Sequence, residues 1–91
     1  MRTVDLDRPW QLHPQVSVRP EPFGALLYHF GTRKLSFLKD RTLLAVVQSL
    51  AESATARDAC LTAGVTDPEL PRYQRALGTL ATSSMVIERA S

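Results

Sequence analysis

The spacing of apolar residues changes once along this 91-residue chain, and the change falls at Asp40. Before Asp40, polar and apolar residues alternate over Gln15–Arg19 and again over Arg33–Leu38, which is the period of a half-buried strand. After Asp40, apolar residues recur at intervals of three and four, which is the period of an amphipathic helix. The sequence therefore predicts strands in the first half and helices in the second.

Three consecutive strands are predicted before Asp40. Pro20 is expected to end the first strand, because proline cannot continue a central ladder. Phe23–Phe30 is the second strand, and a short link containing Gly31 joins it to the third, which indicates a β-hairpin. The three strands form an antiparallel meander in which Leu35 and Phe37 are expected to face the core.

Three helices are predicted after the strands. Asp40 is placed to cap a helix over Arg41–Ser53, and Thr55 to cap a second helix that Gly64 ends. A third helix begins near Pro68, since proline suits a first helical turn. Its apolar face is made by Leu70, Tyr73, Leu77, Leu80 and Ala81.

The expected fold class is α+β, because a three-stranded sheet cannot bury its apolar face without helices to cover it. The parts are those of a winged helix-turn-helix-like domain, with a three-stranded antiparallel sheet followed by three helices. We expect the domain over residues 15–91 and an N-terminal arm over residues 1–14, which Trp10 and Leu12 fix to the domain. Met85–Ile87 is expected to be a short final extension.

The composition excludes several classes of protein. Cys60 is the single cysteine, so neither an intrachain disulfide nor a thiolate-rich metal site is possible. No apolar run approaches the roughly 18 residues that span a membrane. The first seven residues lack the apolar stretch of a secretory signal, so a cytoplasmic protein with no membrane association is expected.

No pattern in the chain favours catalysis. His13 and His29 lie 16 residues apart, with no carboxylate at short helical spacing that would complete a metal site. The four glycines are scattered and form no phosphate-binding loop. We therefore expect a protein that is not an enzyme and that holds no cofactor of its own.

A mild basic cluster surrounds the predicted third strand; it consists of Arg33, Lys34, Lys39 and Arg41. One interpretation is a solvated strand edge that its charges protect from aggregation. The other is a surface for an acidic peptide or for phosphate. An extended peptide can also add as a further strand to the free edge of a small sheet. The third helix offers few basic side chains, so the support for DNA binding is thin.

Two runs of the sequence, Trp10–Val16 and Arg19–Leu38, strongly resemble the mycofactocin biosynthesis chaperones, a family within the wider PqqD-like group. The resemblance extends from Trp10 to about Ile87, and the second run is its most distinctive part. It implies a recognition element for ribosomally made precursor peptides. The leader of the precursor would dock as an added strand between the third strand and the third helix.

The resemblance also implies partners and a site. The partners are the precursor's leader peptide and a radical S-adenosylmethionine maturase, which itself holds the iron–sulfur clusters; nucleic acid is not expected. The predicted peptide-binding residues are Arg33, Lys34, Leu35, Ser36, Phe37, Tyr73, Ala76, Leu77 and Leu80. Leu77 and Leu80 are equally well explained as core residues.

Two other functions remain open from the residues alone. A small winged-helix DNA-binding protein would show an affinity for duplex DNA that falls steeply with salt. A structural subunit of a larger enzyme would co-purify with that enzyme and be insoluble without it.

Overall fold

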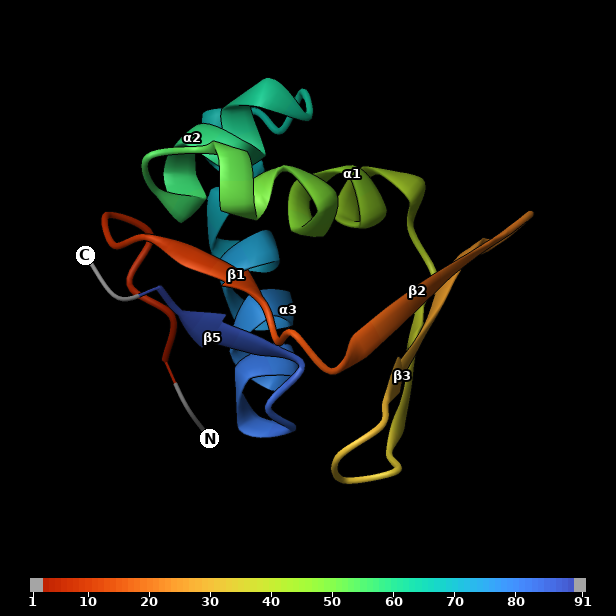
Figure 1. Cartoon of the computed structure of the whole chain (residues 1–91). Coiled ribbons are helices and arrows are strands. Elements are labelled where there is room, and N and C mark those ends of the chain that lie inside the picture. The colour runs from red at the N-terminus through yellow and green to blue at the C-terminus, as the bar shows by residue number, and fades with distance from the viewer. Residues whose placement is uncertain (1–2, 90–91) are drawn as a thin grey trace.

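The computed structural model describes residues 3–89, which form one α+β unit with helices on one side of a sheet (Figure 1). The strands are β1 (Trp10–Leu12), β2 (Val16–Glu21), β3 (Gly24–His29), β4 (Leu35–Leu38) and β5 (Val86–Glu88). The helices are α1 (Arg41–Ser49), α2 (Ala56–Thr62) and α3 (Leu70–Thr82), with short 3₁₀ turns at Leu50–Glu52 and Asp67–Glu69. The three predicted strands and the three predicted helices are confirmed in that order, but the structure adds β1 before them and β5 after α3. The likeness to a winged helix stays a prediction.

The three predicted strands form an antiparallel sheet in the order β2-β3-β4, as expected for a meander. The first strand is longer than predicted, because it continues through Pro20 to Glu21. Phe30 donates its backbone N–H to Gln15 at 2.9 Å, so odd-numbered residues of β2 point their main-chain groups toward β3. The nitrogen of Pro20 therefore faces the free edge of β2, where a missing N–H costs no ladder bond.

The prediction that Leu35 and Phe37 face the core is wrong. Their exposed fractions are 54% and 61%, whereas Leu38 is 1% exposed. The register explains the difference, since Ser36 lies opposite Leu27, which is fully buried on the helix side of the sheet. Alternation along a strand then places Leu35 and Phe37 on the face away from the helices.

The predicted caps at Asp40, Thr55 and Gly64 are confirmed, whereas the first helix ends at Ser49, earlier than the predicted Ser53, and a 3₁₀ turn follows it. The side chain of Asp40 accepts from the backbone N–H of Thr42 at 2.8 Å, and that of Thr55 from Asp58 at 3.1 Å, so both act as N-caps. Gly64 adopts a φ of 93° after α2, and the N–H of Val65 reaches back to the carbonyl of Cys60 at 3.0 Å. This is the left-handed helix ending for which glycine is suited.

The two ends of the described chain pair with each other, which the sequence did not predict. β1 and β5 form a two-stranded antiparallel sheet in which Trp10 lies opposite Glu88. Arg8 and Glu88 extend this pairing with an ion pair at 2.8 Å. Residues expected as a simple extension, Met85–Ile87, are thus partly a strand that closes the domain.

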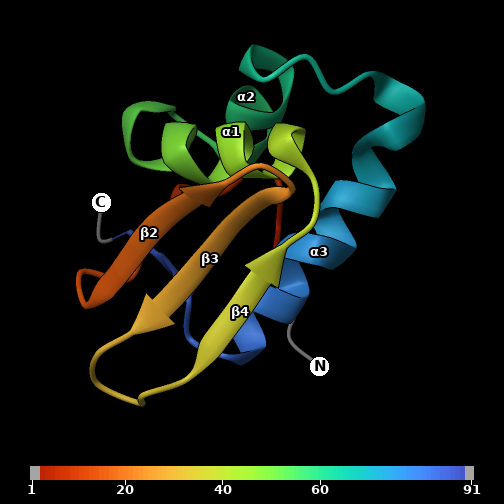
Figure 2. The same cartoon turned by 90° about the vertical axis from the view of Figure 1, so that its right-hand side faces the viewer.

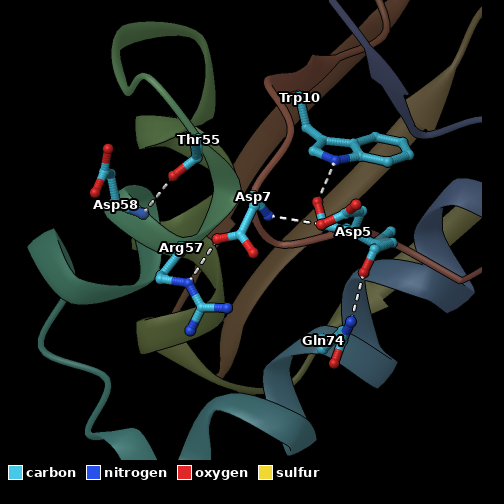
Figure 3. Close-up of polar contacts among 8 residues, drawn as sticks. Asp5, Asp7, Trp10, Thr55, Arg57, Asp58 and Gln74 are labelled. Carbon is cyan, nitrogen blue, oxygen red and sulfur yellow. Dashed lines mark hydrogen bonds and ion pairs between the residues drawn. The ribbon is translucent and has the colours of Figure 1, made fainter.

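The N-terminal stretch is attached to both α2 and α3 (Figure 3). Arg57 of α2 binds the carboxylate of Asp7 at 2.9 Å, and Gln74 of α3 donates to the carbonyl of Val4 at 2.6 Å. Trp10 is 6% exposed, and its indole N–H donates to the carbonyl of Asp5 at 3.0 Å. Trp10 therefore fixes this stretch to the domain as expected, while the division of the chain at residue 14 stays a prediction.

Candidate functional site

The strand β4 forms one edge of the sheet, and no described residue pairs with its outer side. His29 donates its backbone N–H to the carbonyl of Lys34 at 3.0 Å, which makes this the first hydrogen-bonded pair of the β3–β4 ladder. Main-chain groups alternate in direction along an antiparallel strand. Ser36 and Leu38 therefore bond toward β3, and the N–H and C=O groups of Leu35 and Phe37 point outward.

The helix residues predicted for peptide binding lie on α3, which sits behind the sheet on the side of β4 (Figure 2). Tyr73, Leu77 and Leu80 are 5%, 1% and 5% exposed, so they belong to the hydrophobic core. Ala76 is partly buried against that core. Of the two explanations that the sequence left for Leu77 and Leu80, burial favours the core; a role in peptide binding stays a prediction for all four.

A polar cluster joins the end of β4 to α3, and we refer to Asp40, Arg72 and Tyr73 as the Asp40 cluster. Tyr73 donates its hydroxyl to the Asp40 carboxylate at 2.6 Å, and the Arg72 guanidinium lies 3.6 Å from the same oxygen. The Arg72 guanidinium also lies 5.4 Å from the centre of the Tyr73 ring. Sequence reasoning identified Asp40 only as a helix cap and missed that it fixes α3 beside the edge strand.

The Asp40 cluster shifts two pKa values. Burial alone would raise the pKa of Asp40, but hydrogen bonds from Tyr73 and from the backbone of Thr42 and Leu43 outweigh it and lower that pKa. The hydrogen bond to the Asp40 carboxylate, together with burial, raises the pKa of the Tyr73 hydroxyl above its ordinary value. Tyr73 is therefore a neutral hydrogen-bond donor at neutral pH.

The predicted basic cluster is exposed at both ends of β4. Arg33 and Lys34 precede the strand, and Lys39 follows it. Arg41 donates to the carbonyl of Pro22 at 3.0 Å. Within residues 3–89, no carboxylate lies in ion-pair distance of these four cations, since the recorded ion pairs involve other residues. The edge strand is thus flanked by positive charge that no carboxylate among the described residues neutralises.

Two side chains that could carry chemistry, His29 and Cys60, are buried. His29 is 2% exposed, and its Nδ1 accepts the backbone N–H groups of Gly31 and Thr32, which stabilises the β3–β4 loop. Burial raises the pKa of the Cys60 thiol, so it is not an activated nucleophile. No group of three or more potential metal ligands lies together in the described part of the chain. None of its helices is long and apolar enough to cross a membrane.

A hollow of about 410 Å³ lies where the N-terminal stretch meets α2 and α3. It is lined by Leu6, Arg57, Asp67, Leu70, Pro71 and Gln74. None of the predicted peptide-binding residues lines it, and Arg57 is already paired with Asp7. The hollow is therefore separate from the β4 edge.

Comparison with known proteins identifies a family for the arrangement. The model of the peptide chaperone MftB family matches residues 9–87. Peptide chaperone MftB of Mycobacterium tuberculosis is 65% identical over 85 residues, which cover 93% of this chain and 78% of that protein. Peptide chaperone MftB of Mycolicibacterium smegmatis is 60% identical over 85 residues, which cover 93% of this chain and 83% of that protein.

A third relative, peptide chaperone MftB of Mycobacterium ulcerans, is 65% identical over 91% of this chain and 76% of its own length. No solved structure matches the chain. The family is one of peptide chaperones and not of enzymes, which agrees with the expectation from the residues. The resemblance seen in Trp10–Val16 and Arg19–Leu38 is thereby confirmed.

Proposed function

Because this chain belongs to the peptide chaperone MftB family, we propose that it binds the leader of a precursor peptide by strand addition at β4. The bound precursor is then presented to a radical S-adenosylmethionine maturase in mycofactocin biosynthesis. The chaperone does no chemistry of its own; it acts by tethering. Holding the leader raises the effective concentration of the precursor's reactive end at the maturase.

The observation on which the proposal depends is the free edge of β4. The outward N–H and C=O groups of Leu35 and Phe37 offer up to four main-chain hydrogen bonds to an added strand. The opposite edge, β2, contains Pro20, whose nitrogen faces outward and cannot donate. Of the two edges of this sheet, β4 is therefore the better template.

Electrostatics supports the same edge. Arg33, Lys34 and Lys39 are exposed and lack carboxylate partners within the described residues. They would attract a leader that carries acidic side chains, and such complementarity acts mainly on the rate of association.

Substitution of Phe37 separates main-chain from side-chain recognition. Phe37→Pro removes an N–H that has no partner in the sheet, so the domain should fold while leader affinity falls at least about tenfold. Phe37→Ala keeps that N–H and should retain most of the affinity. Both are measured by titration calorimetry with a synthetic leader, and the fold is checked by thermal unfolding.

The register supplies a control on the other side of the strand. Ser36 bonds toward β3, opposite Leu27, so Ser36→Pro should lower the unfolding temperature of the free domain instead. Strand addition at β4 would be refuted if folded Phe37→Pro protein bound the leader as tightly as the wild type.

A further inference from the structure

The face of the sheet that points away from the helices is an apolar surface, which we name the open face. It consists of Leu26, Tyr28, Leu35 and Phe37 on the strands, with Phe23 and Phe30 at strand ends. Figure 2 views this face directly, and no described element lies in front of the sheet.

Most of the exposed large apolar side chains among residues 3–89 lie on the open face. All three phenylalanines of the chain are on it, and Phe23, Phe30 and Phe37 are 48%, 59% and 61% exposed. Their rings contact neighbouring rings on the face. The ring centres of Phe23 and Phe37 are 6.3 Å apart, and those of Phe30 and Tyr28 are 4.9 Å apart in an edge-to-face arrangement. Contiguous exposed apolar surface of this kind marks an interaction site.

The leader alone does not account for the open face. Strands in a sheet lie about 4.8 Å apart, so an added strand beside β4 would run roughly 10 Å from β3. It would reach the margin formed by Leu35 and Phe37. It would not cover the partly exposed Leu26 and Tyr28 in the centre or the exposed Phe30 at the hairpin.

The charges around the open face indicate which partner covers it. Arg41 lies beside Phe23 through its hydrogen bond to the carbonyl of Pro22. Lys39 follows β4 and shares the side of Phe37 by alternation. On β2 the open face has Arg19, which already neutralises the acidic Glu21 at 3.0 Å. The surface is therefore apolar in its centre and cationic at its border.

A second copy of this chain fits that surface poorly. In a face-to-face dimer, the cations at the borders of the two open faces would lie close together and repel each other. In an edge-to-edge dimer with antiparallel β4–β4 pairing centred on Ser36, Arg33 would lie opposite Lys39 of the other copy. Elsewhere in residues 3–89 the one other large apolar side chain that is exposed is Leu61 on α2. A different protein, with apolar side chains bordered by carboxylates, is the complementary occupant.

We infer that the open face binds the maturing enzyme, through a contact surface of that enzyme that is apolar and acidic. The identity of the enzyme rests on the proposed function, while the surface rests on the geometry of this chain. The leader edge and the enzyme surface then share β4, so the enzyme is held next to the peptide that it modifies. The two binding events remain separable, because Phe23 and Phe30 lie outside β4.

The test compares two side chains of equal exposure on different surfaces. Phe23 is 48% exposed on the open face, and Leu61 is 49% exposed on α2. Phe23→Ser should weaken affinity for the reconstituted radical enzyme at least about tenfold, whereas Leu61→Ser should leave it unchanged. Phe30→Ser provides a second open-face variant, and thermal unfolding checks that each variant is folded.

Three readouts decide the inference. Affinity for the synthetic leader should stay within about twofold in Phe23→Ser and Phe30→Ser, and an equal loss for leader and enzyme would assign the face to the leader. Unchanged enzyme affinity in both variants would overturn the inference and leave leader binding intact. A wild-type dimer that these variants dissociate in sedimentation would show that a second copy is the occupant. If the wild type failed to bind the leader, the proposed function itself would fail.

Discussion

The two faces of the β2-β3-β4 sheet use the same alternating pattern for different purposes. On the helix side, Ala25, Leu27 and Leu38 are at most 1% exposed and form the core with α1. On the open face, Leu35 and Phe37, which belong to β4 like Leu38, remain more than half exposed. Burial on the first face stabilises the domain, whereas exposure on the second face leaves apolar surface for a partner.

The strongest test of this comparison uses neighbouring residues of β4. Leu38→Ala removes a fully buried side chain and should cost about 2–5 kcal/mol of unfolding free energy. Phe37→Ala should change that free energy by less than about 1 kcal/mol, because its ring is mostly in solvent. Urea unfolding of both variants provides the measurement, and equal losses would show that the open face is covered in the free protein.

A second test concerns tyrosines on either side of the sheet. Tyr73→Phe removes the hydrogen bond to the Asp40 carboxylate and should lower the free energy of unfolding by about 1–2 kcal/mol at pH 7. The loss is smaller than for a fully buried charged hydrogen bond, because Asp40 is partly exposed to solvent. Tyr28→Phe on the open face is the matched control and should cost much less.

The pH dependence of the Tyr73→Phe effect follows from the lowered pKa of Asp40. A carboxyl whose pKa is lower in the folded state stabilises the fold above its unfolded pKa, near 3.8, and loses this contribution as pH falls through the folded value. The gap in unfolding free energy between wild type and Tyr73→Phe should therefore be full at pH 7 and shrink below about pH 4. A gap that stayed constant down to pH 2 would contradict the assignment.

A smaller effect is expected from the cations that precede and follow β4. The rate of association with an acidic leader should fall about three- to tenfold between roughly 0.05 and 0.5 M salt, with less change in dissociation. Replacing Lys34 and Lys39 with Gln should flatten that dependence, while Arg75→Gln on α3 serves as the control. Stopped-flow fluorescence measures both rates, and equal salt slopes for all variants would reduce the basic cluster to a solvated edge.

Local features of the fold were predictable from the sequence, because their causes are local. Asp40 and Thr55 cap helices through hydrogen bonds to residues two or three positions away, and Gly64 ends α2 by its own backbone conformation. The pairing of Trp10 with Glu88 joins residues 78 positions apart, so no local sequence pattern predicts it. This pairing depends on the packing of the whole chain, which brings its two end segments together.

The orientation of β4 shows why the site was harder to predict than the fold. The segment Leu-Ser-Phe-Leu has apolar residues at both parities, so alternation alone allows either Leu35 and Phe37 or Leu38 to be buried. The register with β3 decides, because Leu27 is buried opposite Ser36. Leu26, Tyr28 and Phe30 share one face of the second strand by alternation. These large apolar residues were a sequence signal that the face opposite Leu27 is also apolar.

The central claim is that the leader adds as a strand to the outer side of β4, and amide hydrogen exchange tests it residue by residue. In the free protein, the N–H groups of Leu35 and Phe37 face solvent, whereas that of Ser36 is bonded within the sheet. With saturating leader, NMR-detected exchange at Leu35 and Phe37 should slow at least about tenfold, with little change at Ser36. Unchanged exchange at Leu35 and Phe37 while the leader is bound would contradict strand addition at this edge.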